Sequence, residues 1–248
     1  MSEAIKVKSL RKSFGPIHAV QGVSFDVKHG EVLGFLGPNG AGKSTTMKMI
    51  TGFLEPTSGT VEVNGHDVLE NPLAVKKSIG YLPEGAPAYG EMTVKSFLNF
   101  VADIRQLSGA SRQKRIDEVI DLINIKNVVD QSIETLSKGY KRRIGIAQAI
   151  MHDPSILILD EPTDGLDPNQ KHEVRNLIKE MAQDKAIIIS THILEEVDAV
   201  CSRAIIIATG NLLFDGTPKE LISKSDRGDI DHAFRIVTTG EDKEAATS

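Results

Sequence analysis

Residues 37–45 read GPNGAGKST and match the spacing G-x-x-x-x-G-K-S, from Gly37 and Gly42 to Lys43 and Ser44. A strand-like VLGFL precedes the stretch and a helix-like STTMKMI follows it, which is the context that this motif requires. The backbone N–H groups of such a loop surround phosphate groups, and the N-terminus of the next helix faces the same anion. We expect a nucleoside triphosphate as the ligand, with Lys43 on its β- and γ-phosphates and Ser44 on Mg²⁺.

An acidic pair, Asp160 and Glu161, follows the aliphatic run SILIL. A carboxylate at the end of a buried strand can hold Mg²⁺ directly or through water. The adjacent carboxylate is well placed as a general base that orients the water attacking the terminal phosphate. A solvated acidic loop is the alternative interpretation, and it loses weight because the same chain contains a phosphate-binding loop.

His192 follows a second aliphatic run, AIIIS, at the expected end of another buried strand. An imidazole at that place can hydrogen-bond the terminal phosphate and the attacking water. A lone histidine is more often structural, and only its position after a core strand makes His192 a candidate. The other histidines are scattered and show no metal-ligand spacing.

The surrounding sequence predicts the elements that position these residues. SILILD, AIIIS and RAIIIA are almost continuously aliphatic, which is typical of strands buried on both faces of a parallel sheet. The first third contains shorter strand-like runs, IKVKSL, GVSFDV and GTVEVNG. KHEVRNLIKEMAQD is expected to form a crossover helix, and Gly210 with Asn211 a hairpin turn.

Residues 93–127 change to helical spacing, which predicts two inserted helices that are separated at residues 108–111. Ser111 is expected to be the N-cap of the second helix. The tail from Asp226 onward is polar, and we expect it to be loosely held.

Bulk properties limit the possible partners. The chain has 248 residues, a formal net charge of −5 and a single cysteine, Cys201, which excludes an internal disulfide and a cysteine-based zinc site. The acidic balance argues against nucleic acid as the main partner. No apolar run approaches the roughly 18 residues that span a bilayer, and the first residues lack the apolar core of a signal peptide. A role in a membrane process would therefore need another chain to cross the membrane.

Together, these motifs resemble the nucleotide-binding subunit of ATP-binding-cassette (ABC) transporters, over residues 5–224 and in the family's order. Residues 136–140, LSKGY, resemble the family's signature motif, and residues 165–167 resemble the loop that crosses its dimer. The resemblance implies ATP and Mg²⁺ as ligands. It also implies an α/β fold: a phosphate-loop NTPase (RecA-like) core with an N-terminal antiparallel β subdomain and an inserted α-helical subdomain.

The same resemblance implies one ABC ATPase domain over residues 1–225. The β subdomain and the RecA-like core are expected at residues 1–88 and 141–225, and the helical insert at residues 89–140. Residues 226–248 are then a polar C-terminal tail.

The resemblance also assigns nucleotide contacts. Phe14 falls where the family stacks an aromatic ring on adenine. Ser137 and Gly139 of the signature turn, and Asp167 of the dimer-crossing loop, are expected to reach the nucleotide of a second subunit. The phosphate loop is expected to supply the remaining contacts: Gly37, Pro38, Asn39, Gly40, Ala41, Gly42, Lys43, Ser44 and Thr45.

Glu161 and His192 are expected to be catalytic, and Ser44, Glu84 and Asp160 to hold Mg²⁺. Glu84 is a departure, because the family usually has glutamine at that place. Its carboxylate can still reach the metal, but it adds negative charge and lacks the amide donor. We therefore predict that Glu84 keeps the coupling role and alters the affinity for Mg²⁺.

The signature turn is a second departure, because LSGGQ is commoner than the LSKGY found in this chain. Lys138 stands where the family usually has glycine, and the sequence alone offers no physical account of it. LSKGY and YLPE together resemble the branch whose partners are type-2 exporter permeases, including gliding-type and multidrug-type systems.

The resemblance implies head-to-tail pairing with a second nucleotide-binding subunit, either an identical copy or a homologue. It also implies a separate integral-membrane permease, a role in export, and a cytoplasmic location, peripheral on the inner face of the cell membrane. Nucleic acid is not expected as a partner. Residues 84–92, EGAPAYGEM, suit a hinge, with Tyr89, Met92 and the first inserted helix as candidates for the permease-facing surface. An ordinary loop with a core aromatic is the alternative for this segment.

Other functional classes fit the sequence less well. A soluble ABC protein of translation, DNA repair or cofactor assembly often carries two cassettes or a long coiled-coil insert. This chain has one cassette and only a short insert, which disfavours that class. A GTPase should show an N-K-x-D motif, and none occurs. A phosphate-loop kinase would not need Glu161 beside Asp160. A regulatory binder without turnover is disfavoured by the complete set of Lys43, Asp160, Glu161 and His192.

Overall fold

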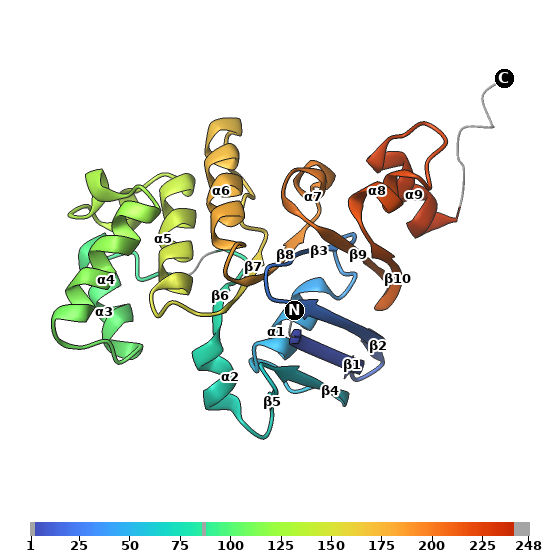
Figure 1. Ribbon diagram of the computed structural model, residues 1–248, viewed down its shortest axis with the longest axis horizontal. Coiled ribbons are helices and arrows are strands. Elements are labelled where there is room, and N and C mark those ends of the chain that lie inside the picture. The colour runs from blue at the N-terminus through green and yellow to red at the C-terminus, as the bar shows by residue number, and fades with distance from the viewer. Residues whose placement is uncertain (1–2, 86–87, 241–248) are drawn as a thin grey trace.

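The computed structural model describes residues 3–85 and 88–240, which form two sheets and the helices around them (Figure 1). A six-stranded sheet in the order β10-β9-β3-β8-β7-β6 forms the centre. All neighbouring strands in it run parallel except β10, which is antiparallel to β9. Its members are β3 (Val32–Leu36), β6 (Ile79–Leu82), β7 (Ile156–Asp160), β8 (Ala186–Thr191), β9 (Arg203–Ala208) and β10 (Asn211–Gly216).

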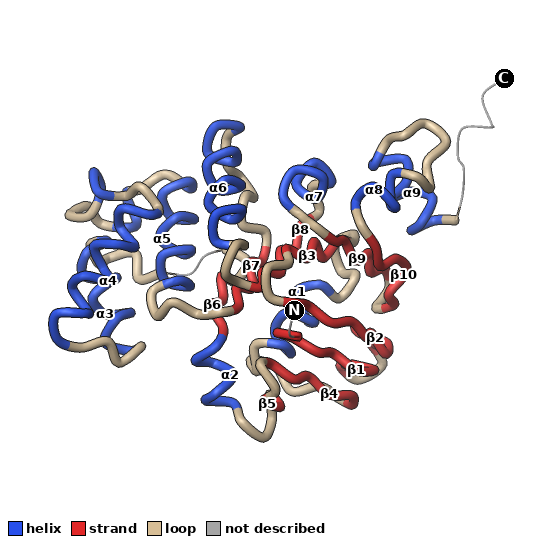
Figure 2. The backbone as a smooth tube through the Cα atoms, in the orientation of Figure 1, coloured by secondary structure: helices blue, strands red, loops and turns tan. Residues whose placement is uncertain are grey.

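A second, antiparallel sheet of four strands lies beside the helix α1 (Lys43–Ile50) (Figure 2). Its order is β2-β1-β4-β5, and its longest members form one hairpin in which Phe14 pairs with Ile17. The predicted combination of a RecA-like core with an antiparallel β subdomain is therefore confirmed. The strands are β1 (Glu3–Phe14), β2 (Ile17–Lys28), β4 (Ser58–Val63) and β5 (His66–Asp67).

The aliphatic runs form the buried centre of the molecule, as their composition predicts. Every residue of β3, β7 and β8 is buried, because helices and the second sheet cover both faces of the central sheet. The predicted crossover helix and hairpin are also present, as α6 and as the β9–β10 pair. The helices of the core are α1 (Lys43–Ile50), α2 (Pro72–Ser78), α6 (Pro168–Met181) and α7 (Leu194–Val200).

Three helices gather at one end of the molecule, on the left in Figure 1. The predicted break between the first two is present, but Ser111 is not the N-cap, because the helix already begins at Gly109 and Ser108 occupies the capping position. Ser111 instead lies inside the first turn and donates its hydroxyl to the Ser108 carbonyl at 2.8 Å. The helices are α3 (Val94–Ile104), α4 (Gly109–Leu122) and α5 (Lys138–Ile150), with 3-10 turns at Lys126–Val128 and Ile133–Thr135.

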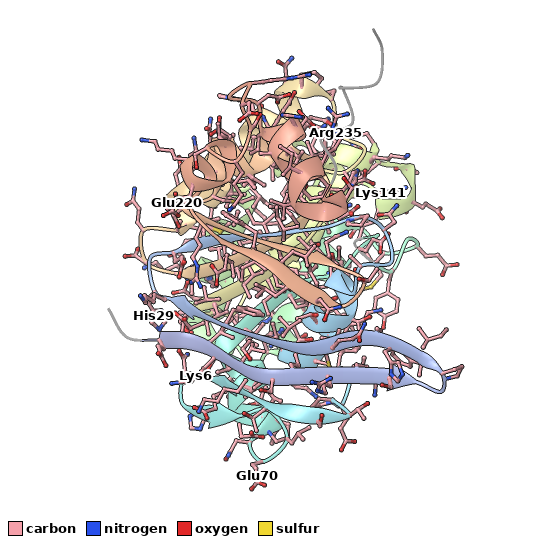
Figure 3. The ribbon with its side chains drawn as sticks, turned by 90° about the vertical axis from the view of Figure 1, so that its right-hand side faces the viewer. Lys6, His29, Glu70, Lys141, Glu220 and Arg235 are labelled. Atoms are coloured by element: carbon pink, nitrogen blue, oxygen red, sulfur yellow. The ribbon has the colours of Figure 1, made fainter. Side chains whose placement is uncertain are left out.

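The C-terminal region corrects one expectation. Part of the tail is not loosely held, because α9 (Ile230–Thr239) packs with α8 (Pro218–Ile222) against β9 and β10. Its amphipathic face places Ala233 in a small apolar cluster with Leu221. In Figure 3 the two helices carry Glu220 and Arg235 at the end of the molecule opposite Glu70. The apolar residues of this face are separated by polar residues along the sequence, because they recur only once per helical turn. The segment therefore reads as polar overall.

The predicted hinge includes Ala86 and Pro87, which lie outside the described residues, as do residues 241–248 of the tail. Across residues 3–85 and 88–240, no helix combines the length and the apolar character that a bilayer crossing requires.

Candidate functional site

The motifs that could do chemistry meet at the carboxyl edge of the parallel sheet. The phosphate loop follows β3, the acidic pair ends β7, and His192 follows β8. Because these strands are parallel neighbours, their carboxyl ends lie side by side. A cleft of about 490 Å³ opens there. Its lining residues are Ala19, Asn39, Gly40, Gly42, Lys43, Ser44, Thr45, Glu84, Glu161, Asp164 and His192.

The phosphate loop has two glycines that no other residue could replace without strain. Gly42 has a φ of +105°, and a β-carbon on it would lie 2.4 Å from the Ala19 carbonyl oxygen. A β-carbon on Gly37 would lie 2.2 Å from the Ile207 carbonyl oxygen. The motif's glycines therefore serve to fit the loop between two neighbouring backbones, in addition to freeing its N–H groups for a ligand.

Helix α1 begins at Lys43 with an N-terminus that no side chain caps. The first N–H groups of a helix have no intrahelical partner, so here they remain available to an anion. The Lys43 ammonium donates to the carbonyl oxygens of Gly37 at 2.7 Å and Pro38 at 3.2 Å. Burial lowers the pKa of Lys43, and the charge of Glu161 is the largest of the influences that oppose this shift. A phosphate would give this buried cation a much stronger partner than two carbonyl groups.

The loop is also held from behind. The amide of Gly210, in the turn between β9 and β10, donates to the Ala41 carbonyl at 3.0 Å. The Gly210 carbonyl in turn accepts from the Gln21 amide of β2 at 2.8 Å. The phosphate loop, the antiparallel sheet and the last hairpin of the central sheet are thus joined by backbone hydrogen bonds.

Glu161 and His192 are brought into direct contact. Nδ1 of His192 lies 2.9 Å from Oε1 of Glu161. Glu161 has a φ of +51°, which is uncommon for a residue with a side chain, and its amide donates to the Ser190 carbonyl at 3.0 Å. Backbone strain of this kind persists only where the surroundings enforce it, and it concentrates at functional sites. The turn after β7 therefore aims the Glu161 carboxylate into the cleft at a conformational cost.

Asp160 is almost fully buried, at 1% exposure, and accepts a hydrogen bond from the Ser190 hydroxyl. Within residues 3–85 and 88–240, no group of three His, Cys, Asp or Glu side chains is arranged to hold an ion. The oxygen atoms at this edge include the Ser44 hydroxyl and the carboxylates of Asp160 and Glu84. This set fits Mg²⁺, which prefers oxygen ligands and usually keeps water and nucleotide phosphates in its coordination sphere.

The predicted signature residues do not line the cleft of their own chain. Ser137 caps α5 by accepting from the Tyr140 amide, and Asp167 caps α6 by accepting from the Gln170 amide at 3.0 Å. A β-carbon on Gly139 would lie 2.4 Å from the Gln170 side chain, so the two caps are neighbours. They form a second polar surface that is separate from the phosphate loop.

Phe14 lies on the β1–β2 hairpin with 47% of its surface exposed, and it is also not a lining residue. The Lys12 ammonium lies 5.2 Å from the centre of its ring. Conversely, Ala19 and Asp164 line the cleft without having been predicted. Ala19 carries no chemical signal in the sequence, whereas Asp164 could have been found as a third acid three residues after Glu161.

A phosphate loop, a buried carboxylate at a strand end and a histidine after the next strand define the class of phosphate-loop NTPases. The ABC signature turn narrows the class, and the comparisons agree with it. The sequence matches the family described as ABC transporter over residues 20–164, more than half of the chain. The chain therefore belongs to the ABC transporter family, as an ATP-binding subunit with ATPase activity, and the predicted recognition is confirmed.

Individual relatives support the same assignment. The uncharacterized ABC transporter ATP-binding protein YxlF of Bacillus subtilis is 38% identical over 88% of this chain and 72% of its own length. The bacitracin transport ATP-binding protein BcrA of Bacillus licheniformis is 37% identical over 92% of this chain and 74% of its own length. A solved ATP-binding subunit of an ABC transporter superposes with a TM-score of 0.84 at 28% identity, covering 94% of this chain and 99% of that one.

Proposed function

We propose that this chain hydrolyses ATP in a head-to-tail dimer of nucleotide-binding subunits and thereby powers export through a separate membrane permease. The observation that carries the proposal is a division of the chain's motifs between two surfaces. The phosphate loop, Glu161 and His192 share one cleft, whereas Ser137 and Gly139 lie outside it. A signature turn that cannot serve its own cleft is explained if it covers the ATP of a second subunit.

In this mechanism Lys43 and the N-terminus of α1 bind the β- and γ-phosphates. Glu161 accepts a proton from the attacking water, which the strained turn holds in line with the terminal phosphate. His192 hydrogen-bonds Glu161 before the nucleotide enters and the γ-phosphate afterwards. Mg²⁺, when bound by Ser44, Asp160 and Glu84 with water, neutralises charge on the phosphates.

In the proposed dimer, the γ-phosphate bound to one subunit accepts hydrogen bonds from the signature turn of the second subunit. The Ser137 hydroxyl and the Gly139 amide stand at the first turn of α5, where a helix favours an anion. Asp167 would face the partner's phosphate loop, and Phe14 the adenine ring. Hydrolysis removes the phosphate that joins the two subunits, so the dimer loosens, a ligand-controlled change of order.

The permease-facing surface is proposed at an apolar groove of about 450 Å³ beside α3. Tyr89 and Ile104 are 60% and 61% exposed there, and the rings of Tyr89 and Phe100 meet edge to face at 5.5 Å between centroids. Met92 is less suitable than predicted, because it is partly buried and packs inward on the core. Exposed aromatic side chains in a groove are typical of a surface that a partner covers.

The names of relatives support export, a permease partner and a peripheral location at the membrane. BcrA is described as a bacitracin transport protein, and a further relative, LnrL of Bacillus subtilis, as a linearmycin resistance ATP-binding protein. CbiO1 of Clostridium perfringens, with a TM-score of 0.82 at 28% identity, is described as part of a transporter complex. Export, a permease partner and a peripheral place on the inner face of the cell membrane follow for this chain by analogy. The division into a single ATPase domain over residues 1–225 with an insert at 89–140 belongs to the same proposal.

The dimer can be tested with Glu161→Gln, which keeps the shape of the side chain and removes the base. With saturating Mg-ATP, this variant should elute from a sizing column as a dimer, and without nucleotide as a monomer. Adding Ser137→Arg to Glu161→Gln should abolish the dimer, because it fills the signature turn with a bulky cation. A Glu161→Gln protein that stays monomeric with Mg-ATP would show that this chain alone does not form the sandwich.

A further inference from the structure

A buried arginine behind the nucleotide cleft has one guanidinium nitrogen without a hydrogen-bond acceptor in the described part of the chain. Arg142 lies in the second turn of α5, and only 7% of it is exposed. Its Nη1 atom is fully buried and has no hydrogen-bond acceptor, and no ion pair involves it within the described part of the chain. The next residue, Arg143, is different, because it pairs with Glu173 and donates to the carbonyl of Ile123. An unpaired buried cation is costly, so its presence requires a compensating influence.

That influence comes from the acidic side chains of the cleft. Four carboxylates act favourably on the Arg142 guanidinium, in the order Asp164, Glu161, Asp160 and Glu84, and oppose the lowering of its pKa by burial. Three of the four line the cleft directly. We call these four residues the carboxylate group.

The position of α5 explains how the arginine comes to face this group. The helix packs against β6, and Gln148 on its far turn donates to the Tyr81 carbonyl of that strand. Glu84 follows two residues after the end of β6. Arg142 stands two helical turns before Ala149, whose carbonyl oxygen faces Gly80 of β6. It therefore shares the sheet-facing side of α5 with Ala149 and, near the beginning of the helix, lies toward the carboxyl edge of the sheet, where the carboxylate group gathers.

Arg142 reduces an excess of negative charge at the cleft. The carboxylate group brings four negative charges, and among the lining residues Lys43 is the permanently charged cation that opposes them. ATP adds more negative charge to the same place. In a partly buried site such charges are poorly screened, so repulsion would weaken the binding of the nucleotide.

We infer that Arg142 is a positioning residue of the nucleotide site: its buried guanidinium offsets the carboxylate group from behind and so lets the cleft accept the phosphate anion. Of the four carboxylates, Asp164 has the strongest favourable influence on the guanidinium. When nucleotide binding closes the cleft, the Nη1 group of Arg142 donates a hydrogen bond to the loop that carries Asp164. The inference rests on the proposed ATPase function of this cleft, but it concerns binding and not turnover.

The test measures binding of the ATP analogue mant-ATP in EDTA, so that no metal offsets the carboxylates. Arg142→Met keeps the length of the side chain and removes its charge, and we expect the Kd to rise about tenfold or more. Arg142→Lys should stay within about threefold of the natural protein, because it keeps the charge. Arg143→Met is the matched control, since it removes the same charge from the same helix, and it should leave the Kd within about twofold.

A second variant separates charge compensation from packing. Asp164→Asn added to Arg142→Met should return most of the lost affinity, because it removes one of the charges that Arg142 offsets. Unchanged binding by Arg142→Met overturns the inference, and so does a loss that Asp164→Asn does not restore. If Arg142→Met does not fold, the same pair of comparisons is made with Arg142→Gln.

The outcomes also distinguish this inference from the proposed function. A natural protein that binds mant-ATP with the predicted pattern of variants, but shows no ATPase with its permease, removes the proposed turnover and leaves the role of Arg142 standing. A natural protein that turns over ATP, with an Arg142→Met variant that binds normally, removes only the role of Arg142. If the natural protein does not bind the analogue, both the proposed ATPase function and the role of Arg142 are wrong.

Discussion

His192 Nδ1 lies 2.9 Å from Glu161 Oε1, although the two residues come from different strands. Glu161 follows β7 and His192 follows β8, and the Glu161 amide also bonds to the Ser190 carbonyl of β8. The proposed base is therefore held at two points by the neighbouring strand. The side chain of Glu161 is 16% exposed and that of His192 46%, so the histidine is the member of the pair that solvent or a ligand reaches more easily.

We predict that His192→Ala lowers the ATPase rate by about 10²-fold, because Glu161 loses the group that orients its carboxylate. Phosphate release at saturating Mg-ATP measures the effect. His172→Ala is the control, since that ring lies on α6 and contacts Asn176, and it should change the rate less than about twofold. Equal rates for the natural protein and His192→Ala would remove this histidine from the mechanism.

Glu84→Gln should raise the Mg²⁺ concentration that gives half-maximal ATPase activity by about three- to tenfold, because it removes one anionic oxygen ligand. A titration of the rate with Mg²⁺ at fixed ATP checks this. Glu70→Gln makes the same change at an exposed position at one end of the molecule (Figure 3) and should leave the curve in place. An unchanged Mg²⁺ curve for Glu84→Gln would contradict the assignment of Glu84 to the metal.

The apolar groove beside α3 should be needed for attachment to the membrane. Replacing Tyr89 and Phe100 together by serine removes two exposed rings and should reduce the share of the protein that sediments with membranes from producing cells about tenfold. Leu73→Ser changes an apolar residue on α2 that is even more exposed, at 75%, and should have no effect. Sedimentation that depends on neither change would place the permease contact elsewhere.

Gly80→Ala should destabilise the protein by about 2–3 kcal/mol through overpacking. A β-carbon there would lie 2.2 Å from the Ala149 carbonyl oxygen and 2.8 Å from Leu157 Cδ2, so β6 or α5 must move. Gly90→Ala is the control, because its β-carbon would approach Glu134 no closer than 3.3 Å, at the side-chain Cβ. Urea unfolding of both variants measures the difference, and equal midpoints would mean that α5 shifts freely.

His152 should make stability depend on pH. Burial, followed by the charge of Arg105, lowers its pKa to about 4 from a usual 6.5, and its Nδ1 atom is buried without a partner. As the pH falls, the unfolded chain therefore takes up the proton before the folded protein does. The contribution of neutral His152 to the free energy of unfolding is complete above pH 6.5 and is lost as the pH falls toward 4. His152→Gln should be less sensitive by about 1–2 kcal/mol between pH 7.5 and 4.5, after allowance for the solvent access of the ring. Urea midpoints at both pH values test it, with exposed His66→Gln as the control that should follow the natural protein.

Much of the site could be read from the sequence because its chemistry is local. The phosphate loop is one continuous stretch, and the acids and the histidine each follow an aliphatic run whose burial is evident from composition. Parallel strands then bring their ends together, so the meeting of Glu161 and His192 follows from the fold. Ala19 could not be found in this way, because it contributes a position on β2 and no chemical group.

The misplaced elements have a different cause. Ser111 was an acceptable cap by residue type, and the choice of Ser108 depends on where the chain turns, which a propensity cannot fix. The α9 helix was missed because a short amphipathic segment is stable only against a partner surface, here the cluster around Leu221. The structure gives Lys138 a place, because its Cδ lies 3.5 Å from the position of a β-carbon on Gly165, so that its aliphatic stem covers the loop that follows Glu161.

The hydrogen bond from Gly210 to Ala41 has a consequence for biosynthesis. The nucleotide motif leaves the ribosome early, but the turn that supports it is made about 170 residues later, and domains fold as units during synthesis. A nascent chain thus carries the complete motif for a long time without its support. Fragments that stop before the β9–β10 hairpin should keep the motif's sequence and lack its geometry, so the order of synthesis itself delays nucleotide capture until the cassette is nearly complete.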